Sequence, residues 1–102
     1  MTEFERGSLN NRIQALAHDY LGRKLQLSEL RLFPYMDYGL KNMGILELVK
    51  LNVQEYECIE KLAEQGFVAI IDENDRTMTL IVKKSFYTFL QEVLWESYVV
   101  KQ

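Results

Sequence analysis

The stretch from residue 52 to residue 82 constrains the fold most, because it predicts a helix that runs directly into a β-hairpin. Asn52 is a strong N-cap residue, and Glu55 stands three places later, where a capping box needs a carboxylate. Gly66 can adopt the left-handed conformation that ends a helix. Two runs rich in apolar and β-branched residues follow, with a polar turn between them. The predicted elements are a helix at 53–65 and strands at 67–71 and 78–82.

Helices are also predicted near both ends of the chain, because apolar residues recur there at the spacing of one helical face. Ser8 and Ser85 stand where an N-cap is expected. No linker, internal repeat or low-complexity tract divides the sequence, so we expect a single domain over residues 1–102. Its outer parts are a flexible lead-in at residues 1–7 and helices at residues 8–21 and 85–99.

The middle of the chain allows several assignments. Residues 25–27 alternate in polarity, which fits either a short strand or a linker. Pro34, the only proline, predicts either a kink near Phe33 or a new helix start, with the helix extending to Met43. Gly39 within that helix costs about 1 kcal/mol relative to Ala, so we expect a close neighbour against it.

The succession of helix, glycine and hairpin resembles the recognition helix and wing of a winged helix-turn-helix domain. The resemblance covers about residues 32–82 and rests on pattern, without a diagnostic motif. It implies an α+β, mostly helical fold, with a three-helix core, a β-hairpin wing and additional N- and C-terminal helices. The chain departs from the family at residues 45–51, which are short for the first helix of the pair and fit a strand as well. The matching frame positions are Leu48, Leu51, Tyr56, Ile59, Leu62, Gly66 and Phe67.

Charge disfavours DNA binding through the predicted helix at 53–65. The chain has a net charge of −3 and a pI of about 5.2, whereas affinity for phosphate groups comes mainly from Lys and Arg. On a helical projection, the outward face of this helix carries Glu57, Glu60, Lys61 and Glu64. Such a face repels phosphates and is usually an ordinary solvated surface.

A surface for nucleic acid or for a protein partner would therefore combine residues from several segments. The basic residues are scattered along the chain, and the acidic helix could itself dock a basic protein. The candidate contacts for nucleic acid or a partner are Arg23, Lys24, Arg31, Lys41, Lys50, Gln54, Glu57, Lys61, Glu64, Arg76, Lys83 and Lys84.

Enzymatic chemistry and metal binding have little support in the sequence. The single His and the single Cys, His18 and Cys58, offer no third group to orient a catalytic pair and too few ligands for zinc. The acidic run at 72–75 lacks the Gly and the distal Glu of a calcium loop. The aromatic run at 33–38 could stack on single-stranded nucleic acid, but packing between helices is the commoner role. We predict a non-enzymatic protein with no cofactor and no metal.

The sequence also predicts a cytoplasmic location. One cysteine cannot form an internal disulfide, so we expect Cys58 to be a buried thiol in a reducing compartment. No apolar run approaches the ~18 residues of a membrane span. Residues 1–6 contain acids and lack the apolar core of a signal peptide.

The last predicted helix is apolar over about half of its circumference, which is more than a surface helix in a monomer needs. Large apolar patches usually mark interfaces, and two-fold dimers are the commonest oligomers. We therefore expect a homodimer, although the helix at 8–21 could cover the excess within one chain. The expected interface residues are Phe86, Leu90, Leu94, Trp95 and Tyr98.

The winged-helix resemblance implies a small transcription-associated regulator that acts as a homodimer. The alternative is a protein-interaction module that binds no DNA and uses the acidic helix or the hairpin to dock a basic partner.

Overall fold

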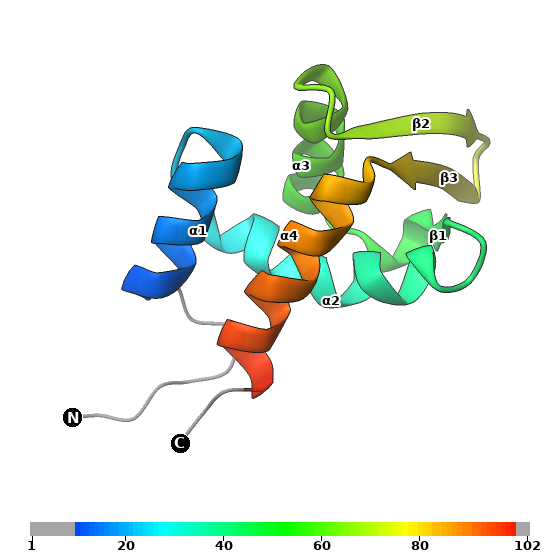
Figure 1. The fold of residues 1–102 in the computed structure, drawn as a ribbon. Coiled ribbons are helices and arrows are strands. Elements are labelled where there is room, and N and C mark those ends of the chain that lie inside the picture. Colours follow the sequence, from blue (N-terminus) through cyan, green and yellow to red (C-terminus); the bar gives the residue numbers. More distant parts are fainter. Residues whose placement is uncertain (1–9, 100–102) are drawn as a thin grey trace.

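The computed structural model describes residues 10–99 and shows an α+β fold in which helices predominate (Figure 1). The predicted lead-in at 1–7 and the predicted cap Ser8 lie outside the described residues. No helix in residues 10–99 combines the length and apolar character needed to cross a membrane. The elements are α1 (Asn11–Leu21), α2 (Leu27–Leu40), β1 (Ile45–Glu47), the 3-10 turn η1 (Leu48–Lys50), α3 (Val53–Glu64), β2 (Val68–Glu73), β3 (Thr77–Val82), α4 (Lys84–Leu94) and the π-type turn η2 (Trp95–Val99).

The core lies where the helices meet, and it is rich in aromatic side chains. Helix α4 packs against both α1 and α2 (Figure 1). Phe33 of α2 and Phe86 of α4 are fully buried and meet edge to face, with ring centroids 6.1 Å apart. Tyr20 of α1 stacks on Phe89 of α4 at 5.0 Å. The wide apolar face of α4 is therefore covered from two sides within one chain.

This packing corrects the predicted dimer interface at two positions. Phe86 and Leu90 are 0% exposed, so neither side chain can face a second copy of the chain. Both side chains are covered within one chain, and for Phe86 the cover includes Phe33 of α2 as well as Tyr20 of the first helix. Leu94 is half-buried against the core, whereas Trp95 remains 57% exposed. The side chain of Tyr98 lies outside the described part of the structure.

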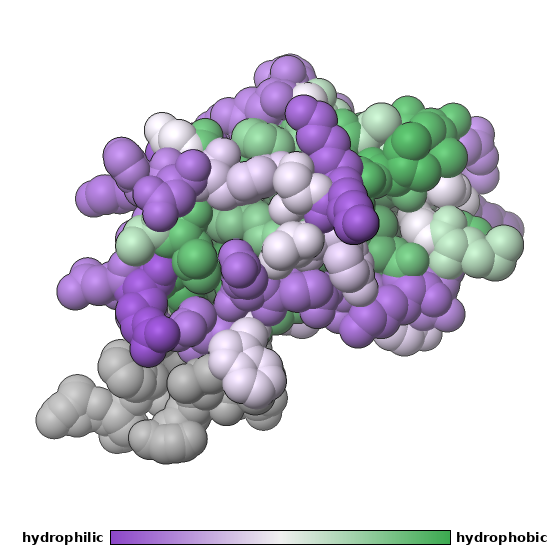
Figure 2. All heavy atoms as spheres, in the orientation of Figure 1, coloured by the Kyte–Doolittle hydropathy of each residue, from purple (hydrophilic) through white to green (hydrophobic). Residues whose placement is uncertain are grey.

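The three strands form an antiparallel sheet in the order β1-β3-β2. Leu46 of β1 pairs with Met78 of β3, and both side chains point into the core. The pairing of β2 with β3 shifts between Ile70 and Asp72, which indicates a β-bulge. On the opposite face, Ile45 and Ile81 are 41% and 54% exposed, and Figure 2 shows hydrophobic surface over the β2–β3 hairpin.

The prediction for residues 52–82 is confirmed in its main elements. The Oδ1 atom of Asn52 accepts a hydrogen bond from the Glu55 N–H at 2.8 Å, and Glu55 accepts one from the Asn52 N–H at 3.0 Å. Helix α3 follows this capping box, and Gly66 ends it with φ 85°. The two predicted strands form the β2–β3 hairpin. Local capping and turn signals therefore determine this region.

Residues 45–51 form a strand and a 3-10 turn, which is the second of the two predicted alternatives. Pairing with β3 holds β1 in an extended conformation, and the Leu48 N–H bonds to the Arg76 carbonyl at 2.8 Å. The cap at Asn52 then starts α3 at once. Between β1 and α3 the structure therefore has η1 and no full helix.

At Pro34 the alternative of a new helix start is wrong, and so is the predicted helix end at Met43, whereas the kink near Phe33 stays a prediction. Helix α2 begins at Leu27 and runs through Pro34 without a new start, because the side chain of Glu29 accepts the Gln26 N–H at 2.9 Å and fixes an earlier beginning. The helix ends at Leu40 and does not reach Met43. Residues 25 and 26 form a linker before α2.

Two glycines determine how α2 connects to β1. A Cβ atom at Gly39 would collide with Cδ2 of Leu46, so the expected close neighbour is confirmed. Gly44 has φ 78°, and a Cβ atom there would collide with the carbonyl oxygen of Leu80. The Gly44 carbonyl accepts the Leu80 N–H at 2.8 Å. The absence of side chains thus lets α2 and the sheet approach closely.

Two of the predicted helix starts are also wrong. The side chain of Asn10 accepts the Ile13 N–H at 2.9 Å, so α1 begins at Asn11 rather than after Ser8. Helix α4 begins at Lys84, ahead of the predicted cap Ser85. The Ser85 hydroxyl instead pairs with the Tyr20 hydroxyl at 2.7 Å, a contact between distant segments that outweighs capping here.

Candidate functional site

Helix α3 presents an acidic outer surface because its apolar residues are turned inward. Cys58, Ile59 and Leu62 are buried against the core. On the opposite side, Glu57, Glu60 and Glu64 are exposed and follow one another at helical spacing. We call these three glutamates the acidic stripe. Lys61 is exposed beside it.

The hairpin turn lies alongside α3 and adds further acids. Tyr56 of α3 donates a hydrogen bond from its hydroxyl to the Glu73 carboxylate at 2.6 Å. This bond to Glu73 raises the pKa of Tyr56 to about 12. The Asn74 side chain accepts the N–H groups of Arg76 and Thr77 at 2.7 and 2.9 Å, which shapes the turn. The exposed charged side chains of the turn are Asp72, Glu73, Asp75 and Arg76.

A hollow of about 460 Å³ lies between η1, the first turn of α3 and the hairpin turn. We call it the hairpin hollow. Val53, which lines it, is 72% exposed, and Val49, which follows the lining residue Leu48 in η1, is 87% exposed. The residues that line the hollow are Leu48, Leu51, Asn52, Val53, Tyr56, Glu73, Asn74 and Asp75.

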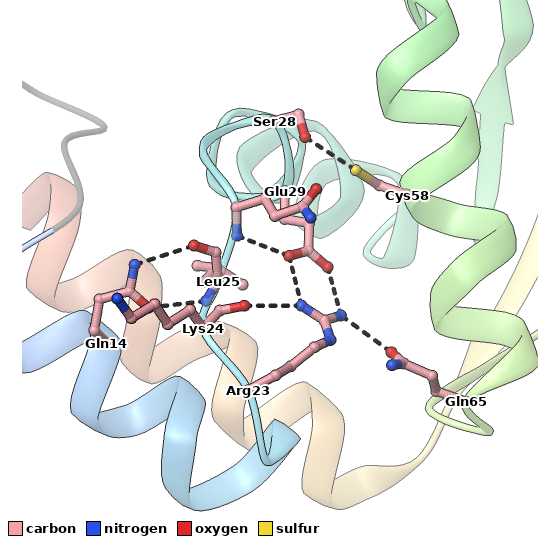
Figure 3. Close-up of polar contacts among 9 residues, drawn as sticks. Gln14, Arg23, Lys24, Leu25, Ser28, Glu29, Cys58 and Gln65 are labelled. Carbon is pink, nitrogen blue, oxygen red and sulfur yellow. Dashed lines mark hydrogen bonds and ion pairs between the residues drawn. The ribbon is translucent and has the colours of Figure 1, made fainter.

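Arg23, one of the predicted contacts, has a structural role. Its guanidinium donates to both oxygens of Glu29 at 2.9 and 2.8 Å, and to the Gln65 side chain at 3.0 Å (Figure 3). The hydrogen bond to Glu29 raises the pKa of Arg23. Glu29 is only 1% exposed, so this arginine neutralises a buried charge and ties α1's end to α2 and α3. Its guanidinium is engaged within the chain.

Sequence reasoning missed Glu29 as the partner of Arg23. Its position three residues after Gln26 is the spacing of a capping box, and this was the signal in the sequence. Nothing in the local pattern indicates that both oxygens of its carboxylate would also accept hydrogen bonds from an arginine in the preceding loop. The same applies to Ser28, whose hydroxyl contacts the Cys58 sulfur at 3.2 Å (Figure 3).

The structure does not bring the predicted basic contacts together on the outer side of α3. Lys41 is paired with Asp37 at 3.0 Å, which raises the pKa of Lys41, and Lys50 lies 3.7 Å from Glu47. The Lys83 ammonium lies 6.0 Å from the centre of the Phe67 ring. Lys61 is exposed on α3 itself, and the remaining basic candidates are exposed on other segments: Lys24, Arg31, Arg76 and Lys84.

Three of the predicted contacts do share one groove. Gln54, Glu57 and Lys61 line it on the α3 side, and Gln26, Leu27 and Ser28 line it on the α2 side. Cys58 lies at its base and is 6% exposed, and burial raises the pKa of its thiol. His18 is exposed on α1. Among residues 10–99, no group of three or more His, Cys, Asp or Glu side chains is placed to hold a metal ion.

Comparison with protein-family models, curated proteins and solved structures finds no match for this chain.

A second apolar hollow lies between α1 and α4, with a volume of about 530 Å³. Leu16 of α1 and Tyr87 and Trp95 of the C-terminal segment line it. Its polar edge includes Glu92 and Glu96, and Glu96 pairs with Arg12 at 3.2 Å. Among the predicted interface residues whose side chains the structure describes, Trp95 is therefore the most available for contact.

Proposed function

We propose that this chain is a small non-enzymatic regulator that binds a basic protein partner through α3 and the hairpin turn. Its architecture would be a variant of the winged helix, because α2, β1, α3, β2 and β3 follow one another in the order that this resemblance implies. The sheet order β1-β3-β2 is compatible with it. The proposal rests on the chemistry of the surface more than on this analogy of fold.

The observation that carries the proposal is the sign of charge on α3. A recognition helix in a major groove lies within a few ångströms of phosphates, and it needs cations and amides on its outer side. Here that side carries Glu57, Glu60 and Glu64, all exposed. Three candidate cations, Arg23, Lys41 and Lys50, are paired with acids of the same chain. The acidic stripe instead suits a partner rich in Lys and Arg.

Direct DNA binding is the second candidate function, and the order of the elements favours it. It would make the chain a transcription regulator of the ordinary winged-helix kind. In that case the exposed cations on other elements would have to contact the phosphates, because α3 itself repels them.

The proposal includes assembly as a homodimer around Trp95. A tryptophan that is 57% exposed beside Leu16 and Tyr87 is the kind of side chain that dominates protein interfaces. With Phe86 and Leu90 in the core, the interface would be centred on the α1–α4 hollow.

Two titrations separate the candidate functions. Fluorescence anisotropy would follow binding of a generic DNA duplex and of a helical Ala/Lys peptide of about 18 residues. We expect the peptide to bind with a strong salt dependence, and the duplex not to bind at physiological salt. The triple variant E57Q/E60Q/E64Q should no longer bind the peptide. The variant D19N, which changes an exposed acid on α1, should retain it.

Two results would contradict the proposal. One is micromolar binding of the duplex by the unmodified chain with a steep salt slope, since this would require a cationic surface. The other is indifference of peptide binding to the triple variant, because the acidic stripe would then not be the contact.

A further inference from the structure

We infer that the hairpin hollow holds an apolar side chain of the basic partner, so that the partner segment is amphipathic. This inference rests on the proposed function and names the part of the surface that gives it specificity. The floor of the hollow is apolar, with Leu48, Leu51 and Tyr56 half-buried against the core. Its wall is polar and comes from the hairpin turn, where Glu73 and Asp75 line it.

The apolar surface beside the hollow is unusually open. Val49 is the most exposed large apolar side chain in the described part of the chain, at 87%, and Val53 is third at 72%, after Met43. Val53 begins α3 and stands at helical spacing above Glu57, so the acidic stripe leads directly into this apolar surface. Apolar surface with a polar edge is typical of a contact site.

The short turn η1 explains why these valines are uncovered. A winged helix-turn-helix would place a full helix between β1 and α3, whereas this chain has five residues there, 48–52, and none of them is buried. No segment among residues 10–99 takes over as a cover, since Val49 and Val53 both stay exposed. A partner segment would bury them and remove this apolar surface from water.

Charge decides which occupant fits the hollow. The hairpin turn carries Asp72, Glu73 and Asp75 against the single cation Arg76, and Glu57 and Glu60 continue the negative surface along α3. Lys50 on η1 is directed to Glu47. A segment with an apolar residue flanked by Lys or Arg would satisfy both the apolar floor and the acidic wall. A second copy of this acidic chain would bring like charges together at this site.

The test compares two peptides of equal charge. Each is a helical peptide of about 18 residues rich in Lys, and one carries a Leu stripe on a single face, where the other has Ser. Isothermal titration calorimetry with the full chain measures both affinities. We expect the Leu peptide to bind ~10-fold or more tightly than the Ser peptide.

Matched variants locate the contact. Val49→Ser and Val53→Ser should each weaken the Leu peptide several-fold and leave the Ser peptide unchanged. Ile81→Ser serves as the control, because Ile81 is an equally apolar residue, 54% exposed, on the outer face of β3. Thermal melts of the variants check that each remains folded. Asp75→Asn should weaken both peptides, since it removes charge alone.

The outcomes separate the inference from the function on which it rests. Equal affinities for the two peptides would contradict binding of an apolar side chain in the hairpin hollow. If E57Q/E60Q/E64Q then bound neither peptide, the acidic stripe would still be the contact for the basic partner. The hollow would also not be the contact site if Ile81→Ser abolished tight binding of the Leu peptide while Val49→Ser and Val53→Ser left it unchanged. Failure of both peptides to bind would contradict the function itself. If the chain self-associated and either Val49→Ser or Val53→Ser removed this association, the hollow would bind a second copy of the chain. That result would contradict the inference.

Discussion

The hydroxyl of Tyr56 donates a hydrogen bond of 2.6 Å to the carboxylate of Glu73, and this contact joins the beginning of α3 to the end of β2. The two walls of the hairpin hollow are thereby held at a fixed separation. Because only the neutral phenol can donate, the bond opposes ionisation of the tyrosine. Ionisation of Tyr56 at alkaline pH would therefore break the contact between α3 and the end of β2.

Tyr56 should ionise at a pKa of about 12, above its ordinary value of 10.0. A raised pKa in the folded state contributes stability that is complete below pH 10 and is lost as the pH rises through about 12. The stability difference between the unmodified chain and Tyr56→Phe should accordingly be constant below pH 10 and shrink above it. Phenolate absorbance of the two proteins measures the pKa by difference. If the difference between the two titration curves had the ordinary tyrosine pKa of 10.0, the bond to Glu73 would not form.

Asn52→Ala should lower the free energy of unfolding by about 1 kcal/mol, which is the usual contribution of an N-cap. The substitution removes the acceptor for the Glu55 N–H at the start of α3. Urea denaturation measures the loss. Gln54→Ala is the control, because it changes an exposed amide in the same turn. Equal stabilities of the two variants would mean that the cap does not hold the helix start.

Arg23→Met should cost about 3 kcal/mol, because it leaves the Glu29 carboxylate buried without its charged partner. We place the loss at the lower end of the range for buried pairs, since the Arg23 side chain is 22% exposed. Lys41→Met makes the same change of charge at the exposed pair with Asp37 and should cost well under ~1 kcal/mol. Chemical denaturation of both variants gives the comparison. A loss no larger than that of Lys41→Met would contradict the structural role of Arg23.

Sedimentation equilibrium at micromolar concentration should give twice the chain mass of 12.1 kDa. Trp95→Glu should shift the equilibrium to monomer, because it places a charge at the centre of the expected interface. Ile81→Glu, on the outer face of the sheet, is the matched control and should not. A monomer for the unmodified chain would remove the homodimer from the proposal, and a dimer unaffected by Trp95→Glu would place the interface elsewhere.

The region from Asn52 to Gly66 was predictable because its signals are local. A capping box, an amphipathic run and a glycine stop all lie within one turn of the bonds that they make. The hairpin followed from two apolar runs around a polar turn. The acidic stripe could be read in the same way, since helical spacing determines which side chains point outward once the inner face is known.

The errors arose where distant segments compete with local preference. Ser85 is a good cap in isolation, but Tyr20 from α1 binds its hydroxyl. At residues 45–47 the sequence left a helix and a strand open, and the strand forms because β3 offers partners from beyond α3. The apolar width of α4 was apparent from the sequence, yet periodicity cannot distinguish cover by α1 from cover by a second copy. The hairpin hollow likewise depends on three segments that meet only in the folded chain.

Gly39 and Gly44 have a consequence for how this chain can evolve. Neither position accepts even a methyl group without moving Leu46 or the backbone at Leu80. Relatives that keep this fold should therefore retain two glycines five positions apart at the end of α2, even where little else is alike. The hairpin turn around Asn74 has no such neighbour and is free to vary in length and charge. Divergent members of this lineage would share that glycine pair and differ in the partners that their hairpins select.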